Sequence, residues 1–148
     1  MYIYLAHQMS GLTAQQLKDY YDPVIKIVQD FGYKPLVPIS KVESKIEGEI
    51  QTHGYTDAAI TDRAIHGRDR WMILKSDIVY MNLLGTTRLS VGCLKEMTIA
   101  YEHNKHLVIV MEDDNIHHHA FVHSEADVIF DNENDALDYL KYNLIGGV

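Results

Sequence analysis

The stretch from Ser76 to Glu112, SDIVYMNLLGTTRLSVGCLKEMTIAYEHNKHLVIVME, decides the fold of this chain. Ile78–Leu83 is an apolar run rich in β-forming residues, which predicts a buried strand. A polar loop follows, and Ser90 is a natural N-cap for a helix whose apolar residues recur at helical spacing. Leu107–Met111 predicts a second buried strand. This strand–loop–helix–strand order is a βαβ unit, which requires a parallel sheet.

Outside this stretch, the alternation of strand and helix patterns continues. Thr13 and Gln16 match a capping box that opens a helix to about Phe31, and Pro23 is expected to kink or divide it. Ser40–Tyr55 has no clear period and is expected to be a long loop or a short helix. The remaining predicted elements are the strands Tyr2–Ala6, Tyr33–Val37 and Asp127–Phe130 and the helices Asp57–Lys75 and Asn134–Asn143. This order predicts one α/β domain over residues 1–148, a flavodoxin-like, doubly wound sandwich with a five-stranded parallel sheet.

The composition limits the possible partners. With 21 acidic and 13 basic residues the formal net charge is −8, which disfavours nucleic acid as a partner. No apolar run approaches the roughly 20 residues that cross a bilayer, so no membrane partner is expected. The chain opens without a signal-peptide pattern, and Cys93 is its only cysteine, which together predict a cytoplasmic protein.

Two acidic side chains occupy unusual positions. Glu96 lies inside a largely apolar helix, and because helical side chains lean toward the helix N-terminus it would reach back over the carboxyl ends of the strands. A solvated glutamate on the outer helix face explains its position equally well. Asp69, taken alone, is most simply a surface partner of Arg68 or Arg70.

Four segments together resemble the nucleoside 2-deoxyribosyltransferase superfamily. They are Tyr2–Ala6, Ile65–Asp69, Ser76–Val79 and Ser90–Glu96, the last followed by Ala100 and Asn104–Lys105. The resemblance implies that Glu96 is a nucleophile that attacks the sugar C1′, that Asp69 assists departure of the base, and that Tyr4 helps to hold the nucleophile. On physical grounds Glu96 near a helix start is expected to stay ionised and a buried Asp69 to be neutral.

The residue six positions before the glutamate points to the substrate. The transferases have an aspartate there that accepts the sugar 5′-hydroxyl, whereas this chain has Ser90, similar to the branch that cleaves nucleoside 5′-monophosphates. A serine hydroxyl, the amide groups at Gly92 and a nearby Arg88 suit a phosphate. The expected reaction is therefore cleavage of the N-glycosidic bond of a (2′-deoxy)nucleoside 5′-monophosphate through a glutamyl-glycosyl intermediate, without a cofactor.

Other residues are assigned to substrate binding by position. The first loop, with His7, Ser10 and Gly11, resembles that of deoxyribosyltransferase-like proteins through its Met-Ser-Gly sequence and is expected to read the base, together with Ser40–Tyr55. Asp127 stands roughly where the transferases take an amide residue from a neighbouring subunit, which suggests a homodimer or larger homo-oligomer with shared sites. His117, His118 and His119 lack a metal-site spacing and are read as a solvated loop without a metal.

Three alternatives remain open. The same residues suit a 2-deoxyribosyltransferase that exchanges one base for another. A protein of a different class, a nucleotide-binding sensor without turnover, would use the same edge of the sheet. A hydrolase of a larger nucleotide such as NAD is the third.

Overall fold

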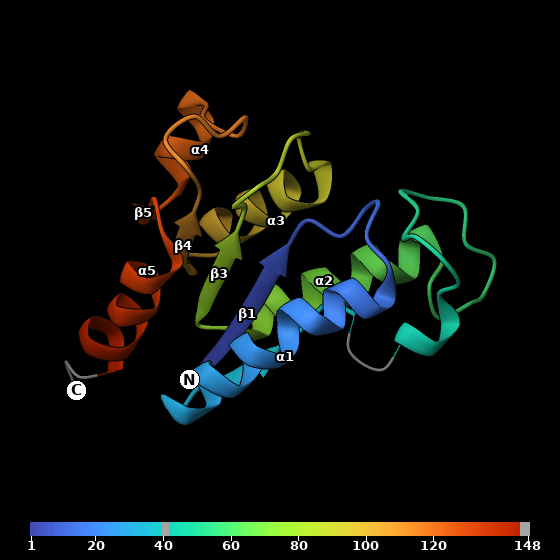
Figure 1. Ribbon diagram of the computed structural model, residues 1–148, viewed down its shortest axis with the longest axis horizontal. Coiled ribbons are helices and arrows are strands. Elements are labelled where there is room, and N and C mark those ends of the chain that lie inside the picture. Colours follow the sequence, from blue (N-terminus) through green and yellow to red (C-terminus); the bar gives the residue numbers. More distant parts are fainter. Residues whose placement is uncertain (40–41, 146–148) are drawn as a thin grey trace.

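The computed structural model describes residues 1–39 and 42–145, and within them the strands form one five-stranded sheet (Figure 1). The strand order is β2-β1-β3-β4-β5, and every pairing is parallel. The strands are β1 (Tyr2–His7), β2 (Lys34–Leu36), β3 (Ile78–Asn82), β4 (His106–Val110) and β5 (Val128–Phe130). The predicted α/β sheet and its flavodoxin-like order are confirmed.

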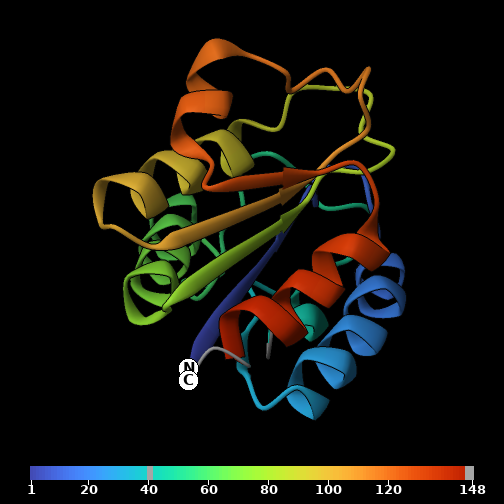
Figure 2. The same ribbon diagram turned by 90° about the vertical axis from the view of Figure 1, so that its left-hand side faces the viewer.

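Helices cover both faces of the sheet (Figure 2). One layer contains α1 (Ala14–Asp30) and α5 (Glu133–Tyr139), which continues as the π-helix η2 (Leu140–Ile145). The other layer contains α2 (Asp62–Lys75), α3 (Val91–Glu102) and α4 (Ala120–Glu125). Because successive strand side chains alternate in direction, β1 gives Ile3 and Leu5 to the first core and Tyr4 and Ala6 to the second.

Helix α1 has the predicted start. Thr13 accepts a hydrogen bond from the backbone N–H of Gln16, whose side chain bonds back to Thr13. The helix runs on through Pro23, so Pro23 does not divide it, and that part of the prediction is wrong. A buried stripe of side chains holds both halves against the sheet, and it consists of Leu17, Tyr21, Val24 and Val28.

Two other boundaries differ from the prediction. Helix α2 begins at Asp62 rather than Asp57, because Asp57 forms a turn with Ala59 and Thr61 is the N-cap. Helix α4 falls in a stretch predicted as loop, and it is only six residues long, too short to show a helical period. Ser40 and Lys41, where the predicted Ser40–Tyr55 segment begins, lie outside the described residues. The described part contains the short 3-10 helix η1 (Glu43–Lys45) followed by loop.

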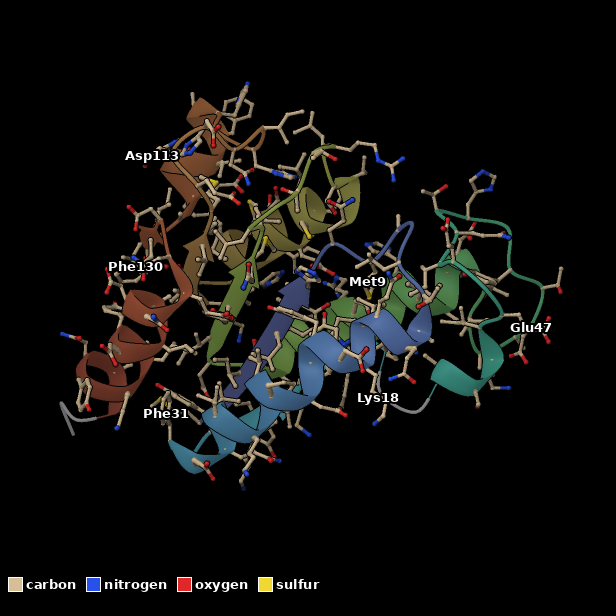
Figure 3. The ribbon with its side chains drawn as sticks, in the orientation of Figure 1. Met9, Lys18, Phe31, Glu47, Asp113 and Phe130 are labelled. Carbon is tan, nitrogen blue, oxygen red and sulfur yellow. The ribbon has the colours of Figure 1, made fainter. Side chains whose placement is uncertain are left out.

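The loops after the strands gather at one edge of the sheet. In Figure 3, Met9 after β1 and Asp113 after β4 lie toward the end to which the strands run, whereas Phe31 lies toward the other end. This carboxyl edge, at the switch point between β1 and β3, is where doubly wound sheets bind ligands. In the part of the chain that the structure describes, no helix is both long and apolar enough to cross a membrane.

Candidate active site

Tyr4 and Glu96 meet between β1 and α3. The Tyr4 hydroxyl donates a hydrogen bond of 2.8 Å to Glu96 Oε1. Tyr4 is fully buried on β1 and points toward the helix layer of α2, α3 and α4. Since its ring is fixed by the packing of a central strand, its hydroxyl also fixes the Glu96 carboxylate. Glu96 is half-buried, so it is not the fully solvated glutamate of the alternative interpretation.

Asp69 approaches the same place from α2. Its side chain is buried, with 7% of its surface exposed, and Oδ1 has no hydrogen-bond partner among the described residues. Arg68 Nε lies 3.6 Å from Oδ1, too far for a good hydrogen bond but close enough for attraction between the charges. The simple surface ion pair considered from the sequence is therefore replaced by a buried, under-bonded carboxyl group.

One cavity of about 200 Å³ is lined by both Glu96 and Asp69. Its lining comes from α2, from the first turns of α3 and from the 51–55 loop. Gly92 and Val91 line it one turn before Glu96 on α3. The polar side chains that also line it are Gln51, Thr52, His53, Tyr55, Asp62, His66, Arg70 and Lys95. A ligand in this cavity would contact both carboxyl groups.

The two carboxyl groups share one electrostatic environment. Burial, and then the negative charge of Asp69, raise the pKa of Glu96 to about 8 against the opposing hydrogen bond from Tyr4. Burial also raises the pKa of Asp69 to about 6, although the Arg68 guanidinium opposes this. The expectation that Glu96 stays ionised is wrong, because burial and the charge of Asp69 raise its pKa, and Glu96 lies beyond the first turn of α3, outside the reach of the helix dipole. Near neutral pH the pair retains one proton.

The start of α3 offers hydrogen-bond donors. Ser90 is the N-cap, and its Oγ accepts a hydrogen bond of 3.3 Å from the Cys93 N–H. Among the described residues, no acceptor is found for the N–H groups of Val91 and Gly92. A Cβ placed on Gly92 would meet no atom within 4 Å, so the space beside this amide is open. A capping hydroxyl still has its own proton to donate, so Ser90 can act as N-cap and ligand contact together.

A second cavity of about 360 Å³ gathers four of the predicted binding residues, His7, Ser10, Gly11 and Arg88. Gly11 has a φ of +85°, and a Cβ there would lie 3.1 Å from an Arg88 terminal nitrogen, so glycine permits the close approach of the guanidinium. His7 Nδ1 lies 2.8 Å from the Asn82 carbonyl, which can only accept, so Nδ1 carries the proton. These four residues therefore come together, but not in the cavity of Glu96 and Asp69.

Asp127 is the exception among the predicted site residues. It precedes β5, at the amino edge of the sheet, where its Oδ2 accepts a 2.7 Å hydrogen bond from the Leu107 N–H and lies 3.7 Å from His106 Nδ1. It lines a separate surface hollow with Lys105 and Tyr101. Within one chain Asp127 is therefore removed from the site, because a residue before a parallel strand lies at the opposite edge from one after it.

Sequence reasoning missed most of the α2 wall and the role of the histidine-rich loop. Six α2 side chains line the cavity at helical spacing, so the face of Asp69 was open to prediction; they are Asp62, Ile65, His66, Asp69, Arg70 and Ile73. His117 is not solvated, since only 1% of its surface is exposed. Among the described residues no three metal-ligating side chains converge to hold an ion.

The fold and the paired carboxyl groups at its switch point define the class of protein. Two carboxyl groups in one cleft, one held by a tyrosine, are the arrangement of an enzyme that acts at a glycosidic carbon. The family model described as nucleoside 2-deoxyribosyltransferase matches residues 3–138, and the chain belongs to this family. It is an enzyme of the transferase or glycosidase type. No curated protein matches the sequence.

Solved structures share the fold at low sequence identity. A 2-deoxyribosyltransferase from Bacillus psychrosaccharolyticus is 16% identical, with a TM-score of 0.68, and the match covers 98% of this chain and 96% of that one. The CMP N-glycosidase BcmB of Clostridium botulinum is 14% identical, with a TM-score of 0.60 over 97% and 99% of the two chains. A 2-deoxyribosyltransferase from Leishmania mexicana is 20% identical, with a TM-score of 0.62 over 93% and 95%.

Proposed function

We propose that this enzyme cleaves the N-glycosidic bond of a nucleoside 5′-monophosphate, with Glu96 as nucleophile and Asp69 as the acid that protonates the leaving base. The observation that carries the proposal is the single cavity lined by the Tyr4-bonded Glu96, the buried Asp69 and the start of α3. A carboxylate is a competent nucleophile at an oxocarbenium-like carbon, and a purine or pyrimidine leaves more readily when it is protonated.

Glu96 has the higher pKa, so the proton of the pair lies mainly on Glu96, and the reaction uses the less populated form in which the proton is on Asp69 and Glu96 is ionised. In the first step Glu96 Oε forms a bond to C1′, the C1′–N bond breaks, and the proton passes from Asp69 to the base nitrogen. In the second step water attacks C1′, its proton goes to Asp69, and the bond between Glu96 and the sugar breaks. Tyr4 keeps one oxygen of Glu96 bonded, so the other oxygen is directed to the substrate.

The start of α3 favours a nucleotide over a nucleoside. The free N–H groups of Val91 and Gly92 lie one turn before Glu96, so a phosphate bound there would be separated from the nucleophile by about one sugar ring. Ser90 adds a neutral hydroxyl where an aspartate would repel the phosphate. The CMP N-glycosidase with the same fold gives a precedent for nucleotide hydrolysis. The other predicted binding residues would contact the substrate only if it extends into the second cavity, which is lined by His7, Ser10, Gly11 and Arg88.

Base exchange is the second candidate function, and one observation favours it. His53 and Tyr55 of the 51–55 loop line the cavity, and a loop position that admits a second base but excludes water would turn hydrolysis into transfer. Two of the solved structures with this fold are 2-deoxyribosyltransferases.

We also propose that the chain forms a homodimer. Helices α2, α3 and α4 each expose one large apolar side chain on the layer that carries the site, namely Trp71, Tyr101 and Phe121, and a dimer interface on this layer would bury them. Light scattering coupled to gel filtration measures this directly: a mass twice that of the chain is expected, and a mass of 17.0 kDa would contradict it.

The test of the function is base release from a panel of nucleosides, their ribo- and deoxyribo-5′-monophosphates and NAD. We expect free base from one or a few monophosphates, and loss of that activity in Glu96→Gln. Glu125→Gln is the matched control, since Glu125 is a carboxylate bonded to α3 through Thr98, outside the cavity. Formation of a new nucleotide only when a second base is added would replace hydrolysis by transfer. Tight nucleotide binding without any reaction would overturn the enzyme proposal in favour of a sensor.

A further inference from the structure

The loop between β4 and α4 contains a buried hydrogen-bond network that the reaction itself does not use. Figure 3 labels Asp113 on this loop. Asn115 and His117 are both buried in it, with 7% and 1% of their surfaces exposed. Loops seldom bury polar side chains so completely, because each buried group needs a partner. Some of the partners lie on the same loop, and the others lie on the segment between β3 and α3, which carries Arg88 and Ser90.

Asn115 ties the two loops together. Its Nδ2 donates hydrogen bonds of 2.8 Å to the Leu83 carbonyl and to Glu112 Oε2, and it also lies 3.2 Å from Thr86 Oγ1. Glu112 Oε1 in turn accepts from the Gly85 N–H. The backbone just after β3 is therefore held at both a carbonyl and an amide.

His117 contacts the N-cap of α3 directly. Its Nε2 accepts a hydrogen bond of 2.9 Å from the Ser90 N–H, which can only donate, so Nε2 carries no proton. The proton is on Nδ1, which lies 2.9 Å from Asn115 Oδ1. This arrangement requires a neutral imidazole of one tautomer. Burial lowers the pKa of His117, which agrees with the neutral form.

The Ser90 N–H bond has a consequence for the donors that remain. With Ser90 N–H bonded to His117 and Cys93 N–H bonded to Ser90 Oγ, the N–H groups of Val91 and Gly92 are the donors at the helix start that have no acceptor within residues 1–39 and 42–145. Both of these residues line the cavity that contains Glu96. The imidazole thereby fixes where the helix start can bind an anion.

We infer that His117 is a positioning residue for the phosphate of a nucleoside 5′-monophosphate, acting through Ser90 to hold the Ser90 hydroxyl and the Val91 and Gly92 amides in place. This inference rests on the proposed function, because it assumes that a phosphate binds at the start of α3. His117 would orient the groups that contact the phosphate without contacting the substrate itself.

The test compares binding of a monophosphate and of its parent nucleoside, measured by calorimetry on the Glu96→Gln variant so that no turnover occurs. Changing His117 to Asn removes the acceptor for the Ser90 N–H, whereas His117→Gln keeps an acceptor at nearly the same reach. His117→Asn is expected to weaken monophosphate binding about tenfold and nucleoside binding by less than about twofold. His117→Gln is expected to bind the monophosphate almost as tightly as the protein with His117 does. His103→Gln, an exposed histidine at the other end of α3, is the control and should change neither.

A readout independent of ligand comes from nitrogen chemical shifts of the histidine rings. They should show His117 with the proton on Nδ1, and this signal should persist with and without nucleotide. Equal weakening of nucleoside and monophosphate by His117→Asn, or a proton on Nε2, would overturn the positioning role while leaving the proposed function intact. Absence of any monophosphate binding by Glu96→Gln would instead overturn the proposed function and the positioning role with it.

Discussion

Replacing Tyr4 by phenylalanine tests the electrostatics of the site directly. The substitution removes the hydroxyl that donates a hydrogen bond of 2.8 Å to Glu96 Oε1, and it keeps the aromatic ring that packs in the core. The hydrogen bond stabilises the ionised form of Glu96, so its loss raises the pKa of Glu96 further above about 8. The fraction of enzyme with an ionised nucleophile and a protonated Asp69 must then fall.

The size of the effect follows from the strength of such a bond. A hydrogen bond to a charged group contributes about 1.5–3 kcal/mol, equivalent to about one to two pH units in the pKa of Glu96. In the wild type the carboxyl pair holds one proton between about pH 6 and about pH 8, so activity should be bell-shaped between these limits. Tyr4→Phe should lower kcat/KM about 10- to 100-fold near pH 7 and move the alkaline limb upward by about one to two pH units.

The assay is base release from the best monophosphate, measured as kcat/KM from pH 5 to pH 10. Tyr21→Phe is the matched control, since the Tyr21 hydroxyl is equally buried but donates to the Leu5 carbonyl at 3.2 Å. It should cost a similar amount of thermal stability and leave the pH profile in place. A Tyr4→Phe enzyme whose profile keeps its alkaline limb, or whose loss of activity equals that of Tyr21→Phe, would refute the reasoning.

Three further predictions concern the same cavity. Asp69→Asn should lower kcat by about 10²- to 10⁴-fold for an ordinary base, and far less for 7-methylguanosine 5′-monophosphate, whose cationic base leaves without a proton; equal losses in parallel assays would contradict the acid role. Ser90→Asp keeps a capping oxygen but sets a carboxylate beside the phosphate, so calorimetry on the Glu96→Gln background should show monophosphate binding weakened at least about tenfold relative to the nucleoside, and unchanged selectivity would place the phosphate elsewhere. Glu96→Gln should stabilise the protein at alkaline pH. The folded pKa of Glu96, about 8, exceeds its ordinary value of 4.5, so the wild type loses stability as pH rises between these values and keeps it below them. The gain should be about 2–4 kcal/mol at pH 8.5 and near zero at pH 4.5, measured by thermal unfolding, and a pH-independent gain would argue against a destabilised carboxylate.

The sheet was predictable because its signals are local. The runs Ile78–Leu83 and Leu107–Met111 are apolar on both faces, and the parallel sheet buries both faces between two helix layers. The caps Thr13 and Ser90 were also visible, since capping requires a side-chain oxygen next to a helical pattern. Boundaries were less predictable where a tertiary contact competes, as at Asp57, which pairs with Lys45 instead of starting a helix.

In the candidate site too, local sequence signals were predictable and the effects of tertiary contacts were not. The motif around Ser90–Glu96 and the resemblance it carries were sufficient to select Glu96, Asp69 and Tyr4, and these three side chains come together in the fold. The raised pKa of Glu96 was not predictable, because a helix-start argument considers one element, whereas this pKa depends on burial between β1, α2 and α3 and on the charge of Asp69. The histidine-rich loop was misread for a related reason, since three adjacent histidines give no local sign that one of them is buried.

The sequence by itself determined the order of the strands, all of the helices except α4, and the parallel sheet, and its resemblance to the family selected Glu96, Asp69 and Tyr4 as candidates for N-glycosidic chemistry. These follow from spacing, propensity and motif, which are properties of neighbours along the chain. Only the tertiary structure decided that Asp127 lies at the far edge from Glu96, that Arg88 and His7 line a separate cavity, and that His117 bonds to the N-cap of the Glu96 helix. Those facts depend on which distant segments pack together and exclude water, and burial of that kind sets both hydrogen-bond partners and pKa values.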